Sequence, residues 1–170
     1  MAGVDEVGAD WTMKKSNLLL NILIAGLIAG TLDIIAAILL LAGGNAVGTL
    51  KFIASGAFGK AALTGGNGMA AWGLAFHYII ALSWTAAYFL LYPRLLFLRR
   101  NKWFNAVAYG VIVQTLMSFV VLPLSNIGPR APTVSGFLEN AAILMFSIGL
   151  PAALLADRFY KKAKRLVDNL

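Results

Sequence analysis

The stretch LLLNILIAGLIAGTLDIIAAILLL occupies residues 18–41 and contains a single charged side chain, Asp33. At a rise of 1.5 Å per residue, about 20 predominantly apolar residues cross the hydrocarbon core of a bilayer. Three more windows of this kind follow, at 69–92, 104–124 and 137–156. Because lipid offers no hydrogen-bond partners, each window is predicted to be a helix. The predicted fold class is therefore all-α, a polytopic membrane protein built as a four-transmembrane-helix bundle.

Composition supports this class. Hydrophobic residues make up 60% of the 170 residues and charged residues only 12%, with a mean hydropathy of +0.80. Soluble domains have about 25% charged residues. The connecting segments are too short for a soluble domain, so we predict a cytoplasmic tail at 1–17, a transmembrane domain at 18–157 and a basic cytoplasmic tail at 158–170. The chain has no cysteine, which excludes disulfides and thiol chemistry.

The basic residues predict an orientation. With four spans, both termini and the middle connection share one face, and this face carries 11 Lys and Arg against three on the other. By the positive-inside rule, both termini are expected to be cytoplasmic. Within the middle connection, the basic side chains are expected to bind lipid headgroups; they are Arg94, Arg99, Arg100 and Lys102. The same charges account for the net charge of +7 without a nucleic-acid partner.

The first span also contains a packing motif. Gly26 and Gly30 form a small-xxx-small pattern that lets another helix approach closely. Asp33 lies three residues beyond Gly30 and shares its face, so the carboxylate is expected to point into the bundle.

A carboxylate inside a membrane needs a partner. The single histidine, His77, lies at nearly the same predicted depth in the second span, and we predict a hydrogen bond or ion pair between Asp33 and His77. Candidate further members of this polar site are Gln114, Ser118 and Ser147. The cluster serves either to fix helix register or as a protonatable site in a ligand pocket or transport path. An Asp and a His are too few ligands for a metal site, and neither a metal nor a cofactor is expected.

The first external loop, residues 42–68, is bracketed by Gly43-Gly44 and Gly65-Gly66. The moderately apolar segment between them, 47–63, is too short to span and is predicted to be an interfacial or re-entrant helix. It either caps a pocket or docks a partner, or it lies on the outer rim of the bundle. The last interpretation is favoured.

Several short motifs share a resemblance: Ile53-Ala-Ser-Gly56, Gly73-Leu-Ala-Phe-His77-Tyr, Tyr109-Gly110 and Val121-Leu-Pro-Leu-Ser125, together with Gly65-Gly66. Across about residues 22–155 the chain resembles an uncharacterised family of small four-helix bacterial inner-membrane proteins. The resemblance implies a bacterial inner (cytoplasmic) membrane location and the four-span layout. His77 matches the family's histidine in the second helix, whereas Tyr78 stands where phenylalanine is more usual.

No sequence motif indicates an enzyme. The function favoured by the sequence is a non-enzymatic accessory or scaffold subunit that packs with itself or with a larger membrane complex. The alternative is a small, oligomeric transporter or channel that uses Asp33 and His77. Four helices leave little room for a private pathway, which favours the first hypothesis or a pore formed by oligomerisation.

Overall fold

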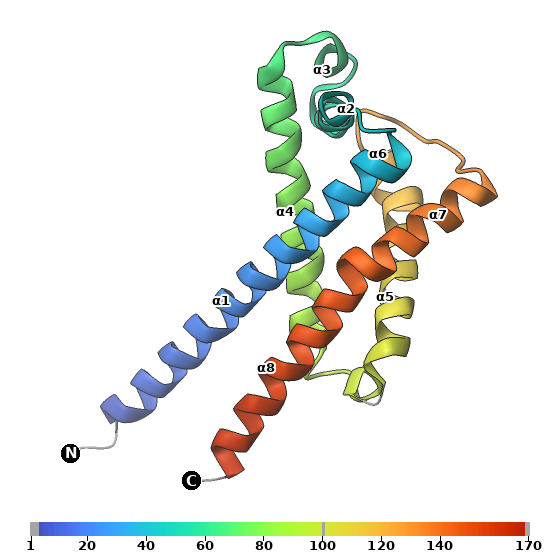
Figure 1. Ribbon diagram of the computed structural model, residues 1–170. Helices are drawn as coiled ribbons and strands as arrows, with labels where there is room; N and C mark the ends of the chain where they lie inside the picture. The colour runs from blue at the N-terminus through green and yellow to red at the C-terminus, as the bar shows by residue number, and fades with distance from the viewer. Residues whose placement is uncertain (1–3, 100, 169–170) are drawn as a thin grey trace.

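The structure is a computed structural model that describes the backbone of residues 4–99 and 101–168, and side chains within 17–95, 97–98, 101–162 and 165 (Figure 1). The secondary structure of this part of the chain is entirely helical. Four of its helices are long and apolar enough to cross a membrane, as predicted, over Asn17–Leu41, Asn67–Leu91, Lys102–Leu124 and Val134–Lys162.

Three of these spans change helix type along their length. The first consists of α1 (Val4–Ala36) and a π-helical turn, η1 (Ala37–Leu41), and the second is α4 (Asn67–Leu91). The third runs through α5 (Lys102–Leu116), the π-helical η3 (Met117–Val121) and α6 (Leu122–Leu124). The fourth runs through α7 (Val134–Leu144), the π-helical η4 (Met145–Gly149) and α8 (Leu150–Asp168). Helix α1 begins well before the predicted span, and the fourth span extends beyond its predicted end at residue 156.

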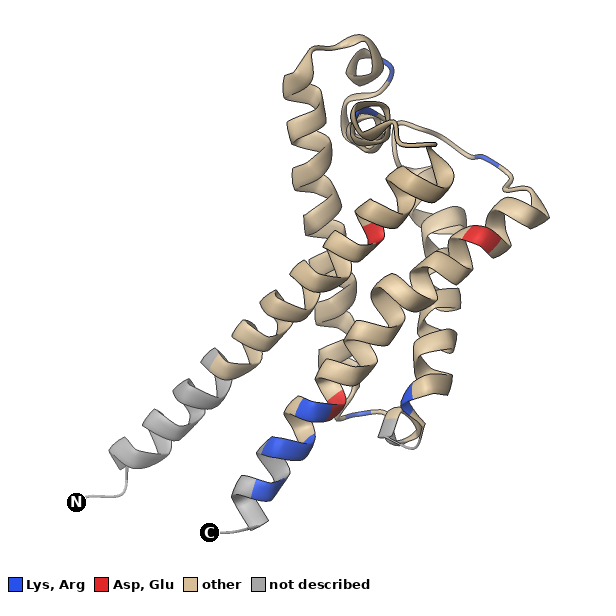
Figure 2. Ribbon diagram, viewed as in Figure 1, with Lys and Arg blue, Asp and Glu red and all other residues tan. Residues whose placement is uncertain are grey.

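The two termini and the connection between α4 and α5 lie at one end of the bundle (Figure 1). This connection contains a short 3-10 helix, η2 (Leu96–Arg99). At the other end lie α2 (Ala46–Phe58), α3 (Ala61–Thr64) and the loop at 125–133. Most of the described Lys and Arg residues gather at the end that holds the termini (Figure 2). The segments predicted to share a face therefore do lie together.

Helix starts follow from capping residues. The Asn45 side chain accepts a hydrogen bond from the Gly48 amide, and the Thr133 hydroxyl accepts one from the Gly136 amide. Such caps satisfy amides that have no partner within the helix. The turn before Asn45 needs glycine, because Gly43 and Gly44 have φ of 56° and 89°, a region that L-residues with a Cβ rarely adopt.

Close helix crossings depend on glycine. A Cβ on Gly26 would lie 2.5 Å from Leu82 Cδ2, and a Cβ on Gly30 would lie 2.9 Å from the Tyr78 ring. The small-residue face of α1 therefore contacts α4, as expected for this motif. The tightest crossing joins α2 to α4, where a Cβ on Gly73 would clash with the Leu50 carbonyl.

The hydrophobic core lies in the half of the bundle near the termini. Its largest fully buried aromatic side chains, Tyr88 and Phe89, come from α4 and pack with alanines of α8 such as Ala152 and Ala156. Tyr109 of α5 packs edge-to-face on Tyr88, with ring centroids 4.8 Å apart. The opposite half of the bundle contributes little to this core, and a cavity lies there.

Two of the π-helical turns precede a proline at the same spacing. η3 ends two residues before Pro123 and η4 ends two residues before Pro151. Proline has no amide hydrogen and its ring clashes with the preceding turn, and a wider turn is one way for the helix to absorb this defect. In the fourth span this turn ends at Gly149, and the third span ends just after Pro123, at Leu124.

Candidate functional site

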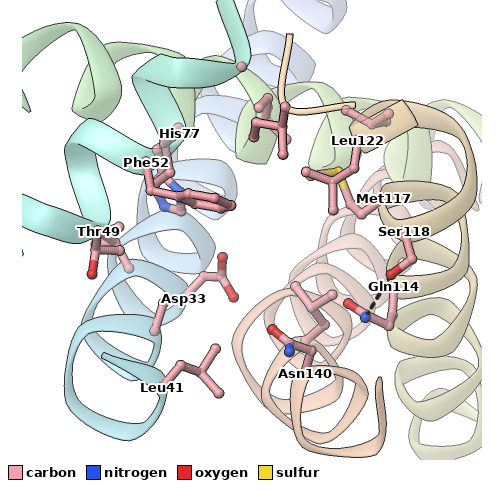
Figure 3. Close-up of a pocket in the computed structure, with 18 of the residues that line it drawn as sticks. Asp33, Leu41, Thr49, Phe52, His77, Gln114, Met117, Ser118, Leu122 and Asn140 are labelled. Carbon is pink, nitrogen blue, oxygen red and sulfur yellow. Dashed lines mark hydrogen bonds between the residues drawn. The ribbon is translucent and has the colours of Figure 1, made fainter. Parts of the chain in front are cut away.

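A cavity of about 1090 Å³ opens between the spans in the half away from the termini. It is lined by residues of all four spans, of α2 and of the loop at 125–133. In Figure 3, Asp33, Leu41, Thr49, Phe52 and His77 lie along one side of this space and Met117, Leu122, Gln114, Ser118 and Asn140 along the other. Pockets for drug-sized ligands have volumes of roughly 300–1,000 Å³, so this cavity can hold an organic molecule.

The lining is mostly apolar and aromatic, with a few polar side chains. Phe52 comes from α2, and Phe76 and Trp84 come from α4. The deeper polar groups belong to different spans: Asp33 of α1, His77 of α4, Gln114 of α5 and Asn140 of α7. Apolar walls with a few convergent polar groups are typical of ligand-binding sites.

These polar groups lie at similar depth. Asp33 is eight residues from the end of its span at Leu41, about 12 Å at the helical rise. His77 and Gln114 are each ten residues from the same side of their spans, or about 15 Å. The polar part of the cavity therefore lies inside the apolar length of the bundle.

Asp33 is held by the fourth span. Its Oδ1 accepts a hydrogen bond of 2.8 Å from the Ser147 hydroxyl. Ser147 lies in η4, and its side chain is buried. Figure 3 shows the Asp33 carboxylate directed into the cavity. The sequence prediction that Ser147 belongs to the polar site with Asp33 agrees with this geometry.

The predicted direct bond between Asp33 and His77 is wrong. His77 Nε2 lies 2.8 Å from the carbonyl oxygen of Gly30. A carbonyl oxygen can only accept, so Nε2 carries the hydrogen and donates it. Gly30 has no side chain to cover its carbonyl, and α4 packs closely against α1 at this point. The His77 imidazole therefore contacts the backbone of α1 rather than the Asp33 carboxylate, which lies about one turn further along the helix.

Gln114 and Ser118 form a second bonded pair. Gln114 Nε2 donates to Ser118 Oγ at 3.0 Å, and both side chains are buried. The predicted polar residues thus form two pairs and one bond to backbone rather than a single network. Asn140 was not predicted, although it lies seven residues before Ser147 and therefore on the same helical face.

Helix α2 lines the cavity, and the favoured expectation of a helix on the outer rim is wrong. Thr49, Phe52 and Ile53 face the cavity. The loop at 125–133 holds the C-terminal end of this helix in place. The side-chain Nδ2 of Asn126 donates a hydrogen bond to the Ala57 carbonyl at 2.7 Å. The position of α2 within a bilayer, interfacial or re-entrant, stays a prediction.

Charged groups are few in the cavity. Its lining includes one acid, Asp33, and two basic side chains, the buried His77 and Arg130, which is exposed in the loop at 125–133. In the part of the chain whose side chains are described, the one ion pair joins Lys161 to Asp157 at the other end of the bundle. Asp33 therefore forms no ion pair with those side chains, although the His77 imidazole lies near enough to interact with it electrostatically.

The expected headgroup-binding residues lie at the end that holds the termini. Arg94 is exposed and donates to the Leu90 carbonyl, and Lys102 is exposed beside the Trp103 ring. The Arg99 side chain and all of Arg100 lie outside the described residues. Binding of these residues to lipid stays a prediction.

A polar network near the termini was missed by the sequence analysis. Tyr92 donates to Asp157 Oδ1 at 2.8 Å, and Lys161 bonds to Oδ2 of the same carboxylate. The i,i+4 spacing of Asp157 and Lys161 was a usable signal.

Within the described residues, no group of three or more His, Cys, Asp or Glu is arranged to hold a metal ion. Comparison of the chain with protein-family models, curated proteins and solved structures finds no match. The residues of the site offer a large, mostly apolar cavity, several hydrogen-bonding groups, the Asp33 carboxylate and the exposed Arg130.

Proposed function

We propose that this protein is a multi-pass membrane protein that binds an amphipathic small molecule in the cavity between its spans, as a small transporter or the binding component of one. The observation that carries this proposal is the 1090 Å³ cavity, with polar groups from four spans set among apolar walls. Of the two functions left open by the sequence, this favours the transporter over the accessory or scaffold subunit.

The location is part of the proposal. A bacterial inner membrane with cytoplasmic termini agrees with the resemblance and with the basic residues gathered at the terminal end (Figure 2). In this orientation the cavity lies in the external half of the bilayer, and the aromatic core around Tyr88 and Tyr109 closes it toward the cytoplasm. A ligand would enter from the outer leaflet or the external face.

The polar groups suit binding rather than catalysis. The imidazole of His77 is engaged by the Gly30 carbonyl, and the Asp33 carboxylate is oriented by Ser147.

Native mass spectrometry of the protein released gently from its own membrane tests the proposal. We expect a retained small molecule on the wild-type protein. Ala37→Phe places a benzyl group in the cavity one turn beyond Asp33, and this variant should lose the molecule. Ala75→Phe is the matched control, since Ala75 is exposed on α4 and does not line the cavity.

Three results would contradict the proposal. A wild-type protein that retains nothing, or a molecule retained equally by Ala37→Phe, would show that the cavity is not the site. A defined complex with companion proteins and an empty cavity would return the scaffold function to first place.

A further inference from the structure

The Asp33 carboxylate forms no ion pair with a described side chain, and the nearby His77 imidazole is engaged by the Gly30 carbonyl. Its carboxylate accepts a hydrogen bond from the neutral Ser147 hydroxyl, and the one ion pair among the described side chains lies at the far end of the bundle. An unpaired carboxylate inside a membrane is costly, and such residues usually pair with a cation or mark a substrate path. A positively charged ligand could therefore supply the counter-charge for Asp33.

The surroundings of Asp33 indicate what kind of cation would fit. The cavity walls carry the aromatic rings of Phe52, Phe76 and Trp84, and Figure 3 shows Phe52 on the same side of the cavity as Asp33. Aromatic faces attract cations through their negative quadrupole, most strongly where water is excluded. A small hydrated metal ion would find too few oxygen ligands here. An organic cation, in contrast, would place its apolar groups against the cavity walls and its charge against the Asp33 carboxylate.

Arg130 is the other permanently charged side chain in the cavity lining. Arg130 is exposed in the loop at 125–133, and no ion pair joins it to Asp33. A ligand recognised by Arg130 would instead be an anion held at the loop. Recognition by Asp33 therefore predicts a cationic ligand, whereas recognition by Arg130 predicts an anionic one.

We infer that the cavity selects hydrophobic organic cations, with Asp33 as the residue that recognises their charge. The inference rests on the proposed function and names its ligand class. The carboxylate oxygens, oriented by Ser147, face the cationic centre, and the aromatic and aliphatic walls contact its apolar groups. Selection by charge follows because an anion of the same shape would place like charges together in a medium of low dielectric constant.

Two probes of nearly the same shape and opposite charge test this inference. Equilibrium dialysis of the purified chain in non-ionic detergent would compare tetraphenylphosphonium with tetraphenylborate, with neutral triphenylphosphine oxide as a third probe and protein-free micelles as blank. We expect tetraphenylphosphonium to bind at least about tenfold more tightly than either of the others, which corresponds to about 1.4 kcal/mol.

Variants locate the selectivity. Asp33→Asn keeps the shape and an acceptor for Ser147 but removes the charge, and it should weaken tetraphenylphosphonium binding about tenfold or more while leaving the neutral probe unchanged. Glu139→Gln is the matched control, because Glu139 is exposed on α7 and does not line the cavity. Ala37→Phe should reduce binding of all three probes.

Three outcomes would overturn the inference. The first is equal binding of the cationic and neutral probes by the wild-type protein. The second is a preference for tetraphenylborate that disappears in Arg130→Gln. The third is a preference for the cation that persists in a folded Asp33→Asn protein. If Asp33→Asn does not fold, the comparison of probes on the wild-type chain still decides. None of these results depends on whether a native ligand is retained, so failure of the charge selectivity and failure of the proposed function are distinguishable.

Discussion

The crossing of the third and fourth spans predicts a specific coupling between two glycines. A Cβ on Gly110 would lie 2.6 Å from the backbone N and Cα of Met145, and a Cβ on Gly149 would clash with the Ala106 carbonyl. Carbon atoms pack at about 3.5–4.0 Å, so Gly110→Ala requires α5 and η4 to separate by about 1 Å. We expect Gly110→Ala to reduce the free energy of unfolding by about 1–3 kcal/mol, the usual cost of overpacking.

Gly149→Ala should cost a similar amount, since it forces apart the same pair of helices. The double variant should cost clearly less than the sum of the two, because the separation imposed by one Cβ makes room for the other. Denaturant unfolding of all four proteins in mixed micelles, followed by circular dichroism, measures the cycle.

Gly68→Ala is the control for this cycle. A Cβ at Gly68 meets nothing within 4 Å, so this change adds helix propensity without crowding and should be neutral or stabilising by up to about 1 kcal/mol. A Gly110→Ala protein as stable as this control, or strictly additive costs in the double variant, would refute the helix contact described above.

Three further predictions concern caps, a buried bond and orientation. Thr133→Ala removes the N-terminal cap of α7 and should lower the free energy of unfolding by about 1 kcal/mol in the same denaturant assay. Thr64→Ala is the control: it removes only a 3.4 Å hydrogen bond and should change the free energy of unfolding by less than about 0.5 kcal/mol. Tyr92→Phe removes a buried bond to Asp157 and should cost about 1.5–3 kcal/mol; a cost no larger than that of Tyr78→Phe, whose bond to Thr31 is exposed, would contradict this assignment. Because the chain has no cysteine, single variants report orientation: in intact cells a membrane-impermeant maleimide should label Gly66→Cys and spare Lys162→Cys, and the reverse pattern would invert the proposed topology.

The four spans could be predicted from the sequence because membrane insertion depends on length and composition, which are local properties. The contact between α1 and α4 could be predicted from Gly26 and Gly30 for a similar reason, since small residues mark where helices approach. The depth of Asp33 and His77 followed from counting residues. The rotation of these two side chains about their helix axes could not be obtained by counting. The predicted side-chain pair was therefore wrong, and His77 bonds to the backbone carbonyl of Gly30 instead.

The cavity itself could not be predicted, because it depends on where α2 lies. That position is set by contacts between residues distant in sequence, namely Leu50 with Gly73 and Asn126 with Ala57. The pattern of residues 47–63 indicates a short helix but not the surface against which it packs. An apolar stripe serves equally well on a rim or along a cavity.

The structure also answers the objection that four helices are too few to enclose a site. α2 supplies an additional wall, and the core packs tightly only in the half near the termini, so the spans can diverge in the other half. The same arrangement defines what transport would require. Tyr109 donates to the Trp84 carbonyl at 2.5 Å and its ring packs on Tyr88, which joins α5 to α4 below the cavity. In the proposed orientation, a ligand held at Asp33 would reach the cytoplasmic side only if this contact opened, so inward release would require α4 and α5 to separate.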